Sequence, residues 1–103
     1  MLLIREIMYC KPGKVKAMVE KSLAMAKLTE QSGLGKMRIM TDFCAERYWT
    51  IVSEYEVSNM QEFEDAMEGK GMSPEIGKEM ERLMEGYHDL VDHGRREVFK
   101  IEG

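Results

Sequence analysis

Cysteine and histidine, the residues that most often bind transition metals, are scarce in this sequence. There are two of each: Cys10, Cys44, His88 and His93. The histidines lie five residues apart, whereas metal-binding pairs on one helix are separated by three or four, and no local set of four ligands is complete. No nucleotide or phosphate fingerprint is present either. We therefore expect no metal site, no cofactor and two free thiols.

Long apolar runs and an excess of positive charge are also missing. No apolar stretch approaches the roughly 18 residues of a membrane-spanning helix, and Arg5 and Glu6 interrupt the apolar start, unlike in a secretory signal. The net charge is −4, with Lys and Arg scattered among Asp and Glu, which disfavours nucleic acid as a partner. We therefore expect a cytoplasmic protein that binds neither membranes nor nucleic acids.

The apolar pattern predicts four strands and two helical regions. Strands are expected at 2–10, 36–43, 47–57 and 95–101. A helix should begin at Val15 and end at Gly33, and a second helical region should run from Asn59 to Gly94 with a break at 69–74. Asn59 and Ser73 are the expected N-caps. The order β-α-β-β-α-β is typical of a ferredoxin-like α+β fold, with a four-stranded antiparallel sheet and both helices on one face, in one domain spanning 1–103.

Two helices cover only one face of such a sheet, and the other face must meet water or a partner. The strand at 2–10 is apolar on both of its faces, which suits a sheet buried on both sides. We expect a homodimer in which the sheets of two copies face each other. Arg38, Glu54 and Glu56 fall on that face and should form a charge cluster, either as satisfied ion pairs or as the polar floor of a ligand site.

Two segments resemble a known superfamily, the dimeric α/β barrel proteins. The opening strand followed by "KPGK" (11–14) and a long helix resembles its NIPSNAP-like branch, as does "ERYWTIVSEYEVSNMQEFE" (46–64), a strand passing directly into a helix. The resemblance implies that two ferredoxin-like sheets pair into one barrel. The superfamily includes small monooxygenases, haem-degrading enzymes and isomerases, so the fold does not define one function.

Aromatic residues and one histidine are the candidate ligand-binding residues. Tyr9, Trp49 and Tyr55 lie on predicted strands and could line a pocket or simply pack in the core. His88 lies at the edge of the apolar stripe of the second helical region. It is interpreted either as a buried structural residue or as the acid or base of a reaction. His93 is expected to cap the end of that helix.

Two functions are therefore compatible with the sequence. The first is a small protein that binds an apolar or aromatic molecule between sheet and helices and acts as a cofactor-independent monooxygenase or an isomerase. The second is a non-enzymatic homodimeric assembly or regulatory module without a ligand pocket. A cavity of roughly 300 Å³ or more next to His88 would favour the first, and a filled core the second.

Overall fold

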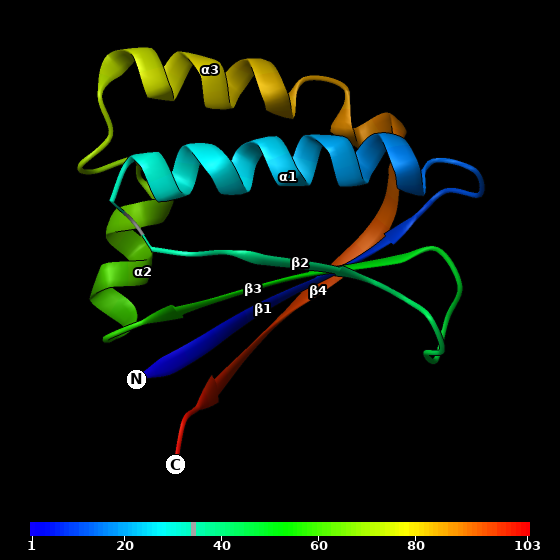
Figure 1. The fold of residues 1–103 in the computed structure, drawn as a ribbon, viewed down its shortest axis with the longest axis horizontal. Coiled ribbons are helices and arrows are strands. Elements are labelled where there is room, and N and C mark those ends of the chain that lie inside the picture. The colour runs from blue at the N-terminus through cyan, green and yellow to red at the C-terminus, as the bar shows by residue number, and fades with distance from the viewer. Residues whose placement is uncertain (34) are drawn as a thin grey trace.

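The protein folds as a four-stranded antiparallel sheet with helices on one face, as the sequence predicts (Figure 1). The computed structural model describes residues 1–33 and 35–103. The strands follow the order β2-β3-β1-β4 within the sheet, so the first and last strands of the chain lie side by side. The elements are β1 (Leu2–Cys10), α1 (Val15–Gln31), β2 (Arg38–Thr41), β3 (Thr50–Val57), α2 (Met60–Met67), α3 (Pro74–Met84), the 3₁₀ helix η1 (Tyr87–Asp89) and β4 (Val91–Lys100).

Alternation along the strands separates a helix-covered face from an open face. On the covered face, α2 packs over one end of the sheet and the start of α1 over the other, because their apolar residues recur every three or four positions. The open face carries the side chains of the opposite parity, such as Arg5 and Ile7 of β1. Two buried clusters form the core: Ile4, Val57 and Phe63, and Cys10, Met18 and Ile51.

Helix α3 packs against α1, which lies between α3 and the sheet (Figure 1). Lys21 of α1 fixes this arrangement, because its Nζ donates to the carbonyl oxygens of Leu83 at 2.9 Å and Glu85 at 2.8 Å. These bonds satisfy carbonyl groups that the end of α3 leaves without partners. Because α3 sits on α1, the helix-side surface of β4 is only partly covered, and Val98 there remains 42 % exposed.

The predicted N-caps and the break in the second helical region are confirmed. The Asn59 side chain accepts a hydrogen bond from the backbone N–H of Glu62 at 2.9 Å, and the Ser73 side chain accepts one from Ile76 at 3.2 Å. Each cap satisfies a backbone donor in the first turn of its helix. Two glycines with positive φ lie between the helices and separate them.

The second helical region ends earlier than the sequence predicts. Helix α3 stops at Met84, Gly86 adopts a left-handed φ of 78°, and β4 has begun at Val91, so Gly94 lies inside a strand. The apolar residues that follow Gly86 pack against the core from η1 and from the start of β4. These residues are Tyr87, Leu90 and Val91, and their spacing of three and four is also that of a continuing helix.

Because α3 ends at Met84 and β4 begins at Val91, His93 lies in the sheet and not at the end of a helix. His93 pairs with Tyr9 across β4 and β1, so the prediction that it caps a helix is wrong. Its neighbour Gly94 allows the two strands to approach, because a Cβ atom at this position would lie 2.7 Å from the carbonyl oxygen of Ile7. His88 and His93 therefore belong to different elements.

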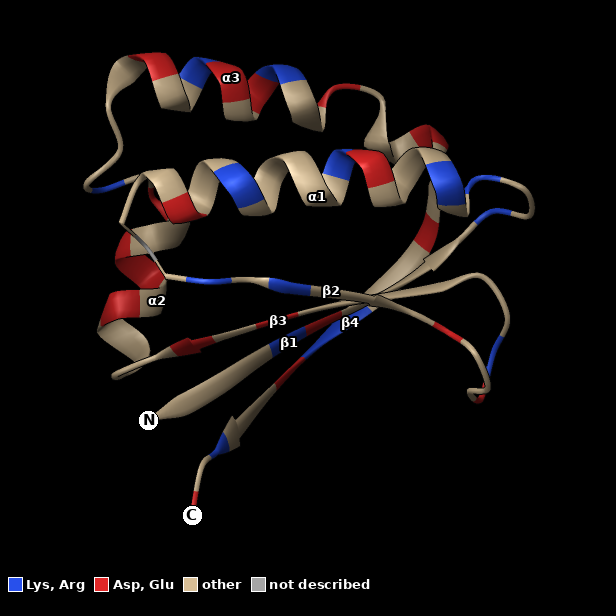
Figure 2. Ribbon diagram, viewed as in Figure 1, with Lys and Arg blue, Asp and Glu red and all other residues tan. Residues whose placement is uncertain are grey.

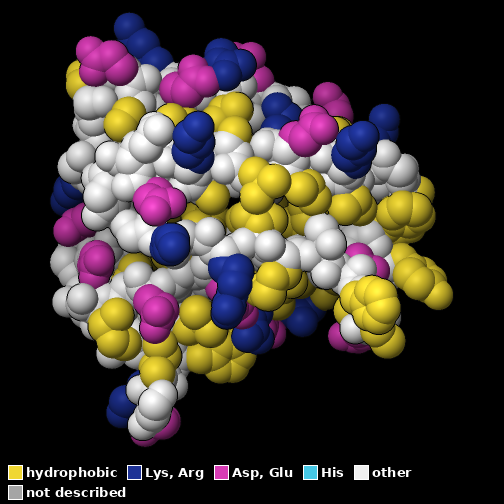
Figure 3. Space-filling view, in the orientation of Figure 1, with side chains coloured by type: hydrophobic (Ala, Val, Ile, Leu, Met, Phe, Trp, Pro, Cys, Tyr) yellow, Lys and Arg dark blue, Asp and Glu magenta, His cyan; other side chains and the backbone are white. Residues whose placement is uncertain are grey.

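The connection between β2 and β3, here called the β2–β3 loop (residues 42–49), is longer than predicted. Trp49 has a φ of 62°, which a strand residue does not adopt, so the predicted strand 47–57 begins only at Thr50. The loop is fastened at its base, because the backbone N–H of Thr50 donates to the Asp42 carboxylate at 2.8 Å. Its apolar residues Phe43 and Tyr48 are exposed, and Figure 3 shows hydrophobic side chains gathered at this loop.

Both cysteines are free, with Cys10 buried and Cys44 exposed. Strands β1 and β2 lie on either side of β3, and because both are antiparallel to it they run in the same direction. Within the described residues, none of the helices combines the length and the apolar character needed to cross a bilayer.

Candidate functional site

The four residues expected to line one pocket do not meet in the structure. Tyr9 lies on the open face of the sheet, opposite the helices. Tyr55 lies on the covered face, with its ring stacked 6.3 Å from that of Phe63 in α2. Trp49 belongs to the β2–β3 loop, and His88 is exposed in η1. Strand alternation therefore separates Tyr9 from Tyr55, and the early end of α3 moves His88 away from a helix face.

Tyr55 is held in its protonated form. Burial, and then the nearby Glu6 carboxylate, raise the pKa of Tyr55 to about 12. A phenol in this state can donate a hydrogen bond, but it does not act as a base near neutral pH. Its contact with Phe63 is that of a core residue.

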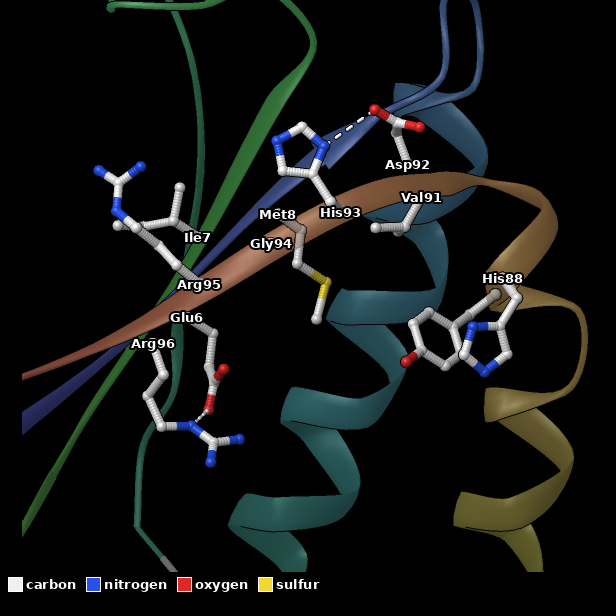
Figure 4. Close-up of a pocket in the computed structure, with 11 residues that line it drawn as sticks. Glu6, Ile7, Met8, His88, Val91, Asp92, His93, Gly94, Arg95 and Arg96 are labelled. Carbon is white, nitrogen blue, oxygen red and sulfur yellow. Dashed lines mark hydrogen bonds and ion pairs between the residues drawn. The ribbon is translucent and has the colours of Figure 1, made fainter.

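His88 borders a cavity of about 370 Å³ on the helix side of β4, here called the helix-side hollow (Figure 4). The hollow lies between β4 and η1. Because Gly94 has no side chain, the floor of the hollow in the middle of β4 is backbone. Its other principal lining residues come from β1, η1 and β4: Glu6, Met8, Tyr87, Val91 and Arg96.

The helix-side hollow has an apolar end and a charged end. At the apolar end, the His88 ring lies beside the Tyr87 ring with 4.1 Å between centroids, and Met8 and Tyr87 pack against the same core cluster. At the charged end, the Arg96 guanidinium donates to the Glu6 carboxylate. In the part of the chain that the structure describes, the His88 imidazole makes no hydrogen bond, so both ring nitrogens can interact with a bound molecule.

A separate charge cluster lies on the open face around Glu54. Its carboxylate is almost buried and accepts hydrogen bonds from Arg38 Nη2 and Arg5 Nε, each at 2.7 Å. The hydrogen bond from Arg38 lowers the pKa of Glu54, burial opposes this shift, and Arg5 adds to it. Figure 2 shows that the sheet carries charges of both signs, with acidic residues on β3 and basic residues on its neighbours β2 and β1.

The predicted cluster thus differs in membership from the observed one. Arg38 and Glu54 pair, whereas Glu56 is exposed and forms no ion pair among residues 1–33 and 35–103. The second partner, Arg5, was missed. Its parity in β1, shared with Leu3 and Ile7, places it on the same face and could have identified it.

Nucleophilic and metal chemistry find little support in the geometry. Burial, and then the Asp42 carboxylate, raise the pKa of the Cys10 thiol, so the reactive thiolate is disfavoured. Across the described residues, no group of three or more His, Cys, Asp or Glu side chains is placed to hold a metal ion. The helix-side hollow with His88 is therefore the candidate site.

Comparisons with known proteins identify the fold. No family model matches the chain, and no curated protein is significantly similar to it in sequence. An uncharacterized NIPSNAP domain protein from Burkholderia xenovorans is similar in structure, with a TM-score of 0.73 at 12% identity, covering 99% of this chain and 95% of its own. A NIPSNAP family protein from Agrobacterium tumefaciens has a TM-score of 0.68 at 9% identity, covering 96% and 90% of the two chains.

An enzyme is also among the similar structures. A protein described as an antibiotic biosynthesis monooxygenase has a TM-score of 0.71 at 13% identity, and the match covers 100% of both chains. At such identities the likeness concerns the fold and not the activity. The chain therefore has the ferredoxin-like fold that NIPSNAP-domain proteins share with this monooxygenase, in agreement with the resemblance in its sequence.

Proposed function

We propose that the protein binds a small apolar or aromatic molecule in the helix-side hollow, with His88 acting on it as a general acid or base. The observation that carries this proposal is the cavity itself. Its volume of about 370 Å³ lies within the range of small-molecule sites, which begins near 300 Å³. The cavity adjoins His88, whose imidazole forms no hydrogen bond among residues 1–33 and 35–103.

The lining of the hollow supports an aromatic or apolar ligand. Met8, Tyr87 and Val91 offer an adaptable apolar wall, and Met side chains interact favourably with aromatic rings. Oxygenation without a cofactor and isomerisation, the two reaction classes that the resemblance suggests, can both start with removal of a proton from the substrate. An imidazole nitrogen can accept that proton and later return it.

We also propose that two copies pair through the open faces of their sheets. This face carries apolar residues next to its charge cluster, and Phe99 of β4, which pairs with Leu3, is 45 % exposed. A second copy would cover these residues. We expect Phe99→Lys to yield monomers in light-scattering measurements, whereas Leu23→Lys at an exposed position of α1, on the helix side of the sheet, should leave the dimer intact. We place the protein in the cytoplasm, where its two free cysteines stay reduced.

A titration with 1-naphthol, a neutral aromatic probe, tests the proposed binding. We expect saturable changes in the NMR signals of His88 and Tyr87, and a several-fold weaker affinity for His88→Ala at an unchanged melting temperature. Gln61→Ala on α2 is the control, because this exposed polar side chain lies outside the lining of the helix-side hollow. The absence of saturable changes in the helix-side hollow would exclude ligand binding there and favour the assembly module.

A further inference from the structure

The open face contains a second cavity of about 370 Å³, here called the open-face hollow, at the end next to the β2–β3 loop. It lies across the sheet from the helix-side hollow, and none of the residues proposed to bind the neutral ligand through their side chains belongs to it. Its floor consists of side chains from three strands: Ile7, Tyr9, Met40 and Val52. Three arginines from three segments surround this floor: Arg5, Arg47 and Arg95.

Tyr9 is the centre of this hollow and is surrounded by cationic groups. The guanidinium carbon of Arg47 lies 4.5 Å from the centroid of the Tyr9 ring, and that of Arg95 lies 5.8 Å from it. Arg95 also donates to the Tyr9 hydroxyl group. Tyr9 is only 8 % exposed as a result, so its ring has a fixed position on the sheet.

The carboxylates around the open-face hollow neutralise two of its three arginines. Arg5 pairs with Glu54 at 2.7 Å, and Arg95 pairs with Glu97 at 3.2 Å. Within residues 1–33 and 35–103, no carboxylate lies within ion-pair distance of Arg47. Arg47 is therefore the arginine of this hollow that has no direct ion pair, although Glu46 beside it also belongs to the lining.

His93 orients Arg47 without neutralising it. Arg47 Nη1 lies 2.8 Å from His93 Nε2, and a guanidinium group can only donate, so Nε2 accepts and carries no proton. The proton of the neutral ring is then on Nδ1, which donates to the Asp92 carboxylate at 2.9 Å. This chain of contacts uses one N–H group of Arg47 and leaves its others available for a ligand.

We propose that the open-face hollow binds a small organic acid, with its carboxylate held by Arg47 and its apolar body resting on Tyr9, Met40 and Val52. A planar guanidinium group binds a carboxylate through two parallel hydrogen bonds, which suits an exposed arginine fixed by a histidine. This site goes beyond the proposed function, because it lies on the opposite face and selects for negative charge. In the homodimer proposed above it would face the partner sheet, so acid binding and pairing of the copies would be linked.

Benzoate and benzamide form the decisive pair of probes, because they have the same shape and differ in charge. We expect benzoate to bind at least tenfold more tightly than benzamide and to shift the NMR signals of Tyr9 and Met40, which line only the open-face hollow, with an affinity that falls as salt is added. Equal affinities of the two probes, or shifts confined to the helix-side hollow, would overturn the proposal. Because this comparison uses the unchanged protein, its result does not depend on the folding of any variant.

Substitutions of Arg47 then test whether this residue provides the positive charge that binds the carboxylate. Arg47→Gln should reduce benzoate affinity to that of benzamide. Arg47→Lys keeps the positive charge but cannot form two parallel hydrogen bonds, so it should retain an intermediate affinity. Arg82→Gln on α3 is the matched control, since Arg82 pairs with Glu79 far from the hollow, and it should change nothing. Unaltered benzoate binding by Arg47→Gln would refute the assignment. The oligomeric state is followed in each titration, because binding and dimer formation are linked.

Discussion

Replacing Glu54 with glutamine tests the energetics of the open face, because the change keeps the size of the side chain and removes its charge. A hydrogen bond to a charged group contributes about 1.5–3 kcal/mol, whereas an exposed ion pair contributes about 0–1 kcal/mol. The Arg5 side chain is 33% exposed, so its bond to Glu54 is close to a hydrogen bond to a charged group. The Arg38 side chain is 72% exposed, so its bond to Glu54 is an exposed ion pair. Glutamine can still accept one hydrogen bond, so we expect the free energy of unfolding to fall by about 2 kcal/mol.

The same substitution should have an effect that depends on pH. Arg38 and Arg5 hold the pKa of Glu54 below its usual range, so the folded state binds this proton less tightly than the unfolded state does. The stabilisation is therefore present above the unfolded-state pKa of about 4.3, and it is lost as the pH falls through the lower pKa of the folded state. The difference between the two proteins should be full at neutral pH and should shrink in acid.

Urea unfolding at about pH 7 and about pH 3, followed by circular dichroism, measures this difference. Glu56→Gln is the control, because Glu56 lies on the same face two residues further along β3 but is exposed. It should change the free energy of unfolding by less than about 0.5 kcal/mol. Equal stability of Glu54→Gln and the unchanged protein at neutral pH, or a difference that persists unchanged in acid, would refute a charge-based role.

Two further pairs of substitutions test the fold by urea unfolding. Gly94→Ala should cost about 1–3 kcal/mol, because its Cβ would lie 2.7 Å from a backbone oxygen, whereas Gly77→Ala in α3 meets open space and should add about 0.5–1 kcal/mol. A neutral Gly94→Ala would contradict the close approach of β1 and β4. Phe63→Ala should cost about 3–5 kcal/mol because the ring is buried between Ile4 and Val57, whereas the exposed Phe43→Ala should be nearly neutral. Similar losses from both phenylalanines would place Phe63 outside the core.

Local patterns in the sequence predicted the regular elements well. The bounds of β1 and the start of α1 at Val15 match the prediction, since alternation, a proline-glycine turn and a change of period all occur within a few residues. The start of β4 was missed because Leu90 and Val91 continue the helical spacing, although Gly86 was a termination signal. The β2–β3 loop was misread because Trp49, a residue typical of strands, adopts a left-handed backbone.

The candidate sites were harder to predict because they join distant segments. Alternation correctly placed Glu54 and Arg38 on one face, but it did not show that Arg5, 49 residues from Glu54 in the sequence, completes the cluster. The contact of Arg47 with Tyr9 depends on how the β2–β3 loop folds back over β1, and no local propensity encodes that path. Sequence periodicity gives the face of a residue, whereas loop geometry decides its neighbours.

The neighbouring positions of β1 and β4 have a consequence for synthesis on the ribosome. Strand β1 leaves the ribosome well before β4, its hydrogen-bonding partner along one side, which ends at Lys100. Until that segment has left the ribosome, one edge of β1 offers unpaired backbone groups beside apolar side chains, a template for contacts with other chains. The sheet can close only after translation of these residues, so the nascent chain should depend on chaperones until then.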